Sequence, residues 1–263
     1  MEYKEGYVAF IDILGFSAYV MDENNFQTTK ELFAFVKKFC DIFNENKKID
    51  IDVSFFSDSI VLTSNDMQKI LINITLLEKH LNKNLGLLFR GGISYGKYYH
   101  SNGVTFGPAV VSAYNLENKA KYARIIIDSN ISIPNQDIIN FYKDIDGELC
   151  INPYFHMFPP YFMEGEKGFI IPPNEYLDVL LPKFVLTQRE ELLNQIKKYN
   201  KSSVVEKYLW RVKPFNLFCI YISNLSDNEN LCMWGQNMKL NRDIKDKIAK
   251  LRISEEELFK IQY

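Results

Sequence analysis

The sequence has 263 residues, 47% of them hydrophobic and 24% charged, a composition typical of a globular protein and not of a disordered or fibrous one. Its 31 Lys and Arg residues against 33 Asp and Glu residues give a net charge of −2 at pH 7. That balance argues against a nucleic-acid partner, because proteins that bind nucleic acid non-specifically carry a basic excess.

The N-terminal segment and the cysteines indicate the compartment. Glu2 and Glu5 stand where a signal peptide would be positively charged, and no apolar run reaches the roughly 18 residues of a membrane span. Four cysteines are scattered without a CxxC pair, so we expect buried thiols and neither disulfides nor a zinc site. The sequence therefore predicts a cytoplasmic protein without membrane insertion.

The first half of the chain predicts alternating strands and helices. An apolar run with one acid predicts a buried strand over Tyr7–Ile13, and apolar residues at helical spacing predict a helix over Phe26–Phe43. Ile51–Leu62 predicts two strands joined by a tight polar turn at Ser57–Ser59, and Met67–Leu81 predicts a second helix.

Three more elements complete this half. A strand is predicted over Leu87–Tyr95, and Gly107-Pro108 begins a helix that runs to about Tyr122, with the proline where its missing N–H costs nothing. Arg124–Asp128 adds a β-branched strand. The order β-α-β-β-α-β-α-β predicts an α+β fold of ferredoxin-like type, with an antiparallel sheet covered by helices on one face.

The second half of the chain is less regular. Prolines interrupt residues 150–175, where we expect loops and short strands. Helical patterns return near residues 188–200, 203–212 and 240–262. No Gly- or Ser-rich linker separates the halves, so we expect a core over residues 1–134 and a C-terminal helical elaboration over residues 135–263 that packs on it without being an independent domain.

Two acids lie in apolar surroundings. Asp12 ends the first strand, and Asp58 lies at the hairpin tip in SFFSDSIVL. A buried carboxylate is costly unless it is paired or binds a metal. The topology brings both to one end of the sheet, where they and the Ile13 carbonyl can hold two hard divalent ions and a triphosphate. The alternative is that Asp12 caps a helix near Gly15 and that Asp58 stabilises a turn.

Four segments in order resemble class III nucleotidyl cyclases. Phe10–Ser17 looks like their first metal-binding segment and Phe56–Ser59 like their second. Arg90–Gly96 is similar to their R-x-G-I-x-x-G strand, and Phe106–Val110 with Leu116-Glu117 to their dimer-facing helix. The resemblance covers residues 7–128. It implies a homodimer that acts on a nucleoside triphosphate with two divalent cations, Mn²⁺ or Mg²⁺.

The departures from that family are informative. Purine cyclases place an Asn and an Arg four residues apart on this helix, where the sequence has Val111 and Asn115, so the transition-state Arg is missing from its usual place. The two base-reading positions hold Ser54, where a purine enzyme has Lys or Glu, and Val104, where an adenylyl enzyme has Asp. At the positions that read the base, the sequence therefore does not resemble the purine cyclases.

A closer resemblance is to the bacterial pyrimidine cyclases of the Pycsar anti-phage defence system. These share the Phe-Ser-Asp-Ser hairpin, the Arg-Gly-Gly strand and the segments that correspond here to Ala113–Glu117 and Arg124–Asp128, and Lys207–Trp210 is similar to their C-terminal part. The resemblance implies synthesis of cyclic UMP from UTP, or of cyclic CMP from CTP. The product would act on a downstream effector that senses the cyclic nucleotide.

The resemblance also assigns roles to single residues. Asp12 and Asp58 would bind the metals together with the Ile13 carbonyl. The triphosphate would be held by the backbone amides of Leu14, Gly15, Phe16 and Ser17. Arg90 and Arg124 are the first candidates for stabilising the developing negative charge, and Lys119 and Lys121 are the next. The alternatives are an ion pair of Arg90 with Asp12, Asp58 or Glu117, and a surface strand-end charge at Arg124.

The choice of base depends on a few side chains. Ser54 can donate or accept a hydrogen bond and so does not discriminate by itself. Phe56, Phe106 and Tyr95 would narrow the pocket against purines, or else they pack in the core, and Asn115 is a further substrate-binding candidate. UTP is preferred because uridylate cyclisation is the more frequent activity that we associate with the family.

Three other readings remain open. A degenerate homologue would bind a nucleotide without turnover, which the missing Asn/Arg pair favours and the two retained acids oppose. A purine cyclase with an unusual pocket is the second. A palm-type polymerase or diguanylate cyclase shares the fold, but Gly91-Gly92 is followed by Ile-Ser and not by an acid pair.

Overall fold

A computed structural model of the chain describes residues 2–45, 50–133, 140–154, 174–226, 231–233 and 236–262. The chain divides into two compact units, the first comprising Met1–Ile133 and Lys143–Ile151 and the second Pro134–Tyr142 and Asn152–Tyr263. Both are described separately below. No helix in the described part of the chain is long and apolar enough to cross a membrane.

The first unit is an α+β structure around one sheet. Its strands are β1 (Lys4–Leu14), β2 (Asp52–Phe56), β3 (Ser59–Ser64), β4 (Leu88–Ser101), β5 (Val104–Phe106), β6 (Ile125–Ile127) and β8 (Leu149–Ile151). Its helices are α1 (Phe16–Met21), the 3₁₀ turn η1 (Glu23–Asn25), α2 (Phe26–Glu45), α3 (Met67–Leu85) and α4 (Pro108–Ala120). The predicted ferredoxin-like succession of elements is therefore present.

The strands are ordered β2-β3-β1-β4-β6-β8, with β5 paired to β4. The neighbouring pairs β2–β3, β3–β1 and β1–β4 are antiparallel, and β6 runs parallel to β4. Strand β7 (Phe141–Lys143) forms a hairpin with β8 and lies where the chain passes between the two units.

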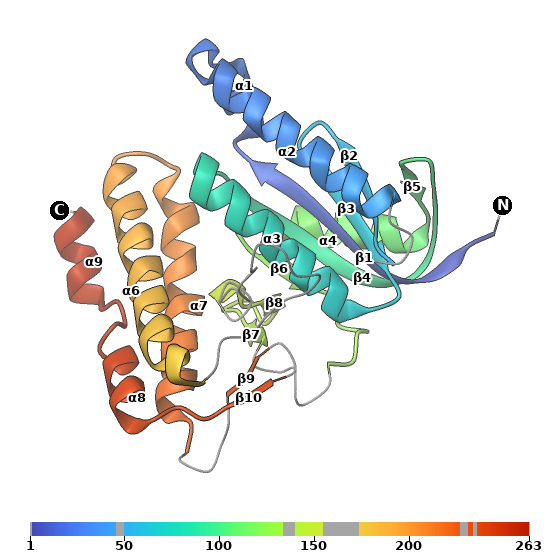
Figure 1. Ribbon diagram of the computed structural model, residues 1–263. Helices are drawn as coiled ribbons and strands as arrows, with labels where there is room; N and C mark the ends of the chain where they lie inside the picture. The colour runs from blue at the N-terminus through green and yellow to red at the C-terminus, as the bar shows by residue number, and fades with distance from the viewer. Residues whose placement is uncertain are drawn as a thin grey trace. The chain divides into compact units, whose positions relative to one another are not determined.

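Helices cover both faces of this sheet, whereas the sequence predicted one covered face. Helix α4 packs on β1, β4 and β6, and α3 packs on β1, β3 and β4. Figure 1 shows α2 and α3 on one side of the strands and α4 on the other. The reason lies in the alternation of side chains along a strand. Ile11, Ile13 and Ile93 are buried on the side away from α4, while Phe10 and Ser94 contact α4.

Strand β4 is longer than predicted and turns into the unpredicted strand β5. The connection is Asn102-Gly103, and both residues have positive φ, at 52° and 76°. An Asn-Gly pair with this geometry is the most favoured two-residue hairpin turn. The Asn-Gly pair in the sequence therefore carried the signal for this hairpin.

The second unit is mainly helical where it is described. It contains α6 (Asn174–Lys198), α7 (Val205–Asn224), α8 (Arg242–Ala249), α9 (Glu255–Gln262) and the strand pair β9 (Leu231–Met233) and β10 (Gln236–Met238). Helices α6 and α7 extend beyond the predicted ranges and contain Pro182 and Pro214. Most of the segment 150–175, where loops and short strands were predicted, lies outside the described residues.

The helix predicted over 240–262 is two helices. Between them, the backbone N–H and carbonyl of Ile253 bond to the Asn216 side chain at 2.8 and 2.9 Å, so they do not continue a helical ladder. Ser254 then begins α9, with its hydroxyl accepting from the Glu257 N–H. The Ser-x-x-Glu pattern of a capping box marks this start.

Cys150 and Cys219 are free and buried, as predicted for these two cysteines.

Candidate functional site

Asp12, Ser59 and Arg90 form one lateral row across the sheet. Asp12 of β1 lies opposite Ser59 of β3 and opposite Arg90 of β4. Residues directly opposite on antiparallel strands project to the same face, so these side chains share the face that α4 covers. The Arg90 Nε–H donates to Asp12 Oδ2 at 3.1 Å. The strand register therefore places a cation beside the first predicted metal ligand.

Asp58 reaches Asp12 from the β2–β3 turn. Ser57 has a positive φ of 56°, which closes the turn tightly, and the Asp58 carbonyl accepts from the Ile13 N–H at 2.9 Å. Burial raises the pKa of Asp12 and the Asp58 carboxylate raises it further, through both charge and a side-chain hydrogen bond, while Arg90 opposes them. The two predicted metal ligands are therefore neighbours.

Glu117 of α4 completes the cluster. Its Oε1 lies 2.7 Å from Arg90 Nε, and its side chain is 4% exposed, compared with 28% for Arg90 and 19% for Asp12. Burial raises the pKa of Glu117 and Arg90 lowers it. An ion pair of Arg90 with Asp12 and Glu117, one of the alternatives weighed from the sequence, is present.

Small residues let α4 approach the sheet closely enough for this contact. Ser94 Oγ donates to the Ala109 carbonyl at 2.6 Å. A Cβ on Gly92 would collide with the Ala113 carbonyl and the Leu116 side chain. Ala109, Ala113 and Glu117 share the buried stripe of α4. The Arg-Gly-Gly sequence thus supplies both the cation and the gap into which α4 fits.

The donor set fits a hard divalent cation. Asp12 and Asp58 supply carboxylate oxygens, which Mg²⁺ and Mn²⁺ prefer, and one or two carboxylates are usual where phosphate oxygens and water complete the shell. Among the described residues, no group of three or more His, Cys, Asp or Glu gathers as a complete metal cage. Asp12 and Asp58 alone would leave the other ligand positions of such a cation to water or to phosphate oxygens.

The predicted phosphate segment lies directly after β1. Leu14 is the last strand residue, opposite Leu88. Gly15 has a φ of 81°, a conformation that favours glycine, and it is the N-cap of the six-residue helix α1. Phe16 is partly exposed and Ser17 is exposed. The alternative in which Asp12 caps this helix is wrong, because Gly15 holds the cap position.

Ser54 lies in a hydrogen-bond chain on β2 and the β4–β5 hairpin. Its hydroxyl donates to the Gly103 carbonyl at 2.8 Å and lies 2.7 Å from Thr105 Oγ1. Thr105 Oγ1 is also 2.7 Å from His100 Nδ1, and burial lowers the pKa of His100. Because the Ser54 proton is used on a carbonyl, Thr105 must donate to Ser54, and His100 to Thr105. Ser54 therefore has no second hydrogen to donate and can offer a ligand only an accepting lone pair.

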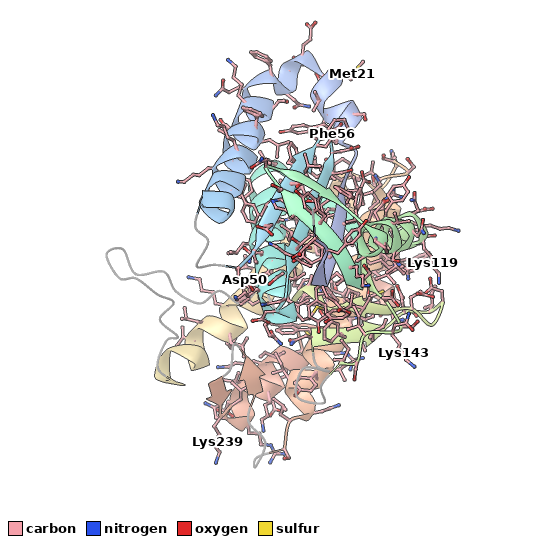
Figure 2. All side chains as sticks on the ribbon, turned by 90° about the vertical axis from the view of Figure 1, so that its right-hand side faces the viewer. Met21, Asp50, Phe56, Lys119, Lys143 and Lys239 are labelled. Atoms are coloured by element: carbon pink, nitrogen blue, oxygen red, sulfur yellow. The ribbon has the colours of Figure 1, made fainter. Side chains whose placement is uncertain are left out.

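The three aromatic candidates do not pack in the core. Phe56 is 84% exposed at the end of β2 (Figure 2), and Tyr95 and Phe106 are 50% and 38% exposed. On α4, Val111 and Asn115 are likewise exposed, on the helix surface opposite the buried stripe. These side chains are available to a ligand or to another chain.

Arg124 is not brought to the Asp12 carboxylate. Its guanidinium is 2% exposed and pairs with Asp144 at 2.7 Å and with Asp146 at 2.6 Å, both in the β7–β8 turn. Its Nε–H donates to the Ala120 carbonyl at 3.0 Å. Lys119 pairs with Glu148 of the same hairpin at 2.6 Å. The alternative of a surface charge at Arg124 is wrong, because the side chain is buried by these acids.

The turn acids Asp144 and Asp146 were missed by the sequence analysis, and Glu117 was considered only as a partner of Arg90. A signal for Glu117 existed, because an acid in the stripe Ala109, Ala113, Glu117 must be paired when that stripe is buried. The turn acids gave no such signal, because Asp-x-Asp-Gly in a loop is typical of any tight turn.

Comparisons with known proteins add little. No protein-family model and no curated protein matches the sequence. Among solved structures, an adenylate/guanylate cyclase/hydrolase from Silicibacter pomeroyi is similar over 57% of this chain and 96% of its own, with 17% identity and a TM-score of 0.37. Values this low support no argument about activity.

Proposed function

We propose that this protein is a nucleotidyl cyclase that makes cyclic UMP from UTP, with release of diphosphate. The observation that carries the proposal is the proximity of the Asp12 carboxylate near the end of β1 to the Asp58 carboxylate in the β2–β3 turn. A hard cation beside a triphosphate is the chemistry that this donor set suits. The sequence segments that resemble class III cyclases contain both acids.

Each residue of the cluster then has a task. Asp12 and Asp58, with the Ile13 carbonyl, would hold two Mn²⁺ or Mg²⁺ ions. Bound there, such ions lower the pKa of the attacking ribose 3′-hydroxyl and neutralise the triphosphate. The amides of residues 14–17 would orient the phosphates. Arg90 is a cation beside the Asp12 carboxylate, which suits it to stabilise negative charge in the reaction.

The test is product formation from each of the four ribonucleoside triphosphates with Mn²⁺, read by mass spectrometry. A cyclic UMP product is expected. Asp58→Ala should lower the rate by more than about 100-fold, since bound metal contributes several kcal/mol to such reactions. Glu31→Gln, an exposed acid on α2, is the matched control and should leave the rate unchanged. Unaltered turnover in a folded Asp58→Ala protein would contradict the metal assignment.

CTP is the second candidate substrate. An oxygen that only accepts from a ligand matches both the amine of cytosine at ring position 4 and the N3–H of uracil, so Ser54 admits either base. A cyclic CMP product would keep the mechanism and change the base. Binding of a triphosphate without any product would favour the degenerate homologue.

We further propose a homodimer, because apolar side chains gather around α4 and the β4–β5 hairpin. Exposed large hydrophobic residues there are Tyr95, Val104, Phe106, Val111 and Tyr114. Exposed large apolar side chains gathered on neighbouring elements are typical of interaction sites. Sedimentation of the wild-type chain should give a dimer, and Val111→Glu should give a folded monomer. A wild-type monomer at micromolar concentration would contradict this arrangement.

The resemblance to pyrimidine cyclases supports a role as a second-messenger synthase in anti-phage defence, with a downstream effector that senses the product. The test is the cyclic nucleotide content of cells that carry the protein, before and after phage infection. A rise that is absent with Asp58→Ala is expected. An unchanged nucleotide pool together with unchanged phage growth would count against this role.

A further inference from the structure

Arg90 Nε has two carboxylates within reach but only one hydrogen. That hydrogen is donated to Asp12 Oδ2 at 3.1 Å. Glu117 Oε1 lies nearer, at 2.7 Å, but the N–H bond is aligned with Asp12, so Glu117 is held by the charge of Arg90 and not by a well-directed hydrogen bond. The guanidinium is thus bonded to one acid while a second acid stands beside it.

The second acid is in the more costly position. A buried acceptor without a donor loses its hydration with no bond in return, so native structures contain few of them. Glu117 is 4% exposed, whereas Asp12 is 19% exposed and has the Asp58 carboxylate as a neighbour. Glu117 therefore has more to gain from the Arg90 hydrogen than Asp12 has.

We propose that Arg90 is a movable counterion of Asp12: its Nε–H donates to Asp12 while the Asp12–Asp58 pair is empty and turns to Glu117 when a divalent cation binds there. Glu117 thereby becomes a positioning residue that sets the affinity for the cation without binding it. This inference rests on the proposed function only in requiring that Asp12 binds a divalent cation.

The movement required is small. Both acceptors already lie within about one hydrogen-bond length of the same nitrogen, so a rotation of the side chain exchanges them. Arg90 lies on β4 and Glu117 on α4, which pack directly on each other, so no backbone element has to move. The other arginine of this unit differs, because Arg124 donates from Nε to the Ala120 carbonyl and from both terminal nitrogens to acids.

The direct test is the arginine side-chain Nε–H spectrum of ¹⁵N-arginine-labelled full-length protein during titration with Mg²⁺. Arg90→Lys identifies the Arg90 cross-peak. We expect that cross-peak to move saturably in the wild type and to stay in place in Asp12→Asn. The Nε–H groups of Arg124 and Arg189, which donate to the Ala120 and Leu251 carbonyls, are internal controls and should not move. A stationary Arg90 cross-peak in protein that binds Mg²⁺ overturns the inference.

A double-mutant cycle on Mn²⁺ affinity, measured by electron paramagnetic resonance of free Mn²⁺, tests the role of Glu117. Glu117→Gln should weaken binding by at least about fivefold, the low end of coupling between two groups. Arg90→Gln should tighten binding, because a competing cation is removed. In the double variant Arg90→Gln/Glu117→Gln, the effect of the Glu117 change should vanish. An equal effect of Glu117→Gln in both backgrounds would show that Glu117 acts on the metal by its charge alone, and it overturns the inference.

These outcomes separate the inference from the proposed function. If the Arg90 cross-peak moves and the cycle shows coupling, the inference holds even if no triphosphate is cyclised. If cyclic nucleotide forms while Arg90 is insensitive to Mg²⁺, the proposed function stands and the inference fails. If neither Mg²⁺ nor Mn²⁺ binds the free protein, the inference is overturned, and if neither binds with UTP present, the proposed function is overturned with it.

Discussion

Two arginines of the first unit each meet two carboxylates, and they do so in opposite ways. The Arg124 cluster comprises Arg124, Asp144 and Asp146, and its guanidinium is 2% exposed, with separate bonds to each acid and to a backbone carbonyl. The Arg90 cluster comprises Arg90, Asp12 and Glu117, and there one N–H lies between two acids. A polar network with every bond made is rigid, and one with a bond too few has more than one arrangement. The first cluster therefore stabilises the fold, and the second is suited to respond to a ligand.

The largest effect is expected from breaking the Arg124 cluster. Arg124→Met leaves Asp144, whose side chain is 1% exposed, as a buried charge without its main partner. Loss of one partner of a buried pair costs about 3–5 kcal/mol, which denaturant unfolding would measure. Arg124→Met/Asp144→Leu should recover most of the loss. If Arg124→Met proves as stable as the wild type, the contrast between the two clusters disappears.

A smaller effect is expected where α4 crosses the sheet. Gly92→Ala forces a methyl group against the Ala113 carbonyl, which should push α4 from β4 and separate Glu117 from Arg90. Overpacking of this kind costs about 1–3 kcal/mol. Cation affinity should fall with stability, whereas Ser112→Ala, an exposed site on α4, should change neither. A Gly92→Ala protein with wild-type stability and affinity would show that the close approach is not needed.

The smallest effect is expected from acid. The Arg124 guanidinium lowers the pKa of Asp146 from 3.8 to about 2. A carboxylate with a lowered pKa adds stability above its unfolded pKa, and that stability is lost as the pH falls from about 4 towards 2. Asp146 is 43% exposed, so solvent screening keeps the contribution small. In Asp146→Asn, the denaturant midpoint of unfolding should depend less on pH over this range than in the wild type. An unchanged pH dependence would contradict the pairing of Asp146 with Arg124 as its source.

Local patterns predicted the elements of the first unit well. The apolar strand with Asp12, the hairpin with Asp58 and the Gly-Pro helix start all depend on neighbours in the sequence, and β1, β2, β3 and α4 lie where these patterns placed them. The proximity of Asp12 and Asp58 followed from topology, because a strand next to a hairpin brings both turns to one end. The sequence also identified Glu117 as one of three possible partners for Arg90.

Features set by tertiary contacts could not be predicted in the same way. The pairing of Arg124 depends on acids twenty or more residues away in a turn with no distinctive pattern. The break between α8 and α9 depends on the Asn216 side chain of a distant helix. The direction of the Ser54 hydrogen bond is decided by Gly103, Thr105 and His100, none of which is its neighbour in the chain.

The division of the chain has a consequence for its synthesis. The first unit recruits residues 143–151 after the chain has already entered the second unit. A nascent chain that ends near residue 134 holds Asp12, Asp58, Arg90 and Glu117 but still lacks Asp144 and Asp146. Arg124 must therefore wait for a later stretch of polypeptide to emerge before its charge is balanced. A ribosome stalled between these two points would carry all the candidate metal ligands in a chain whose last sheet strand has not yet been made.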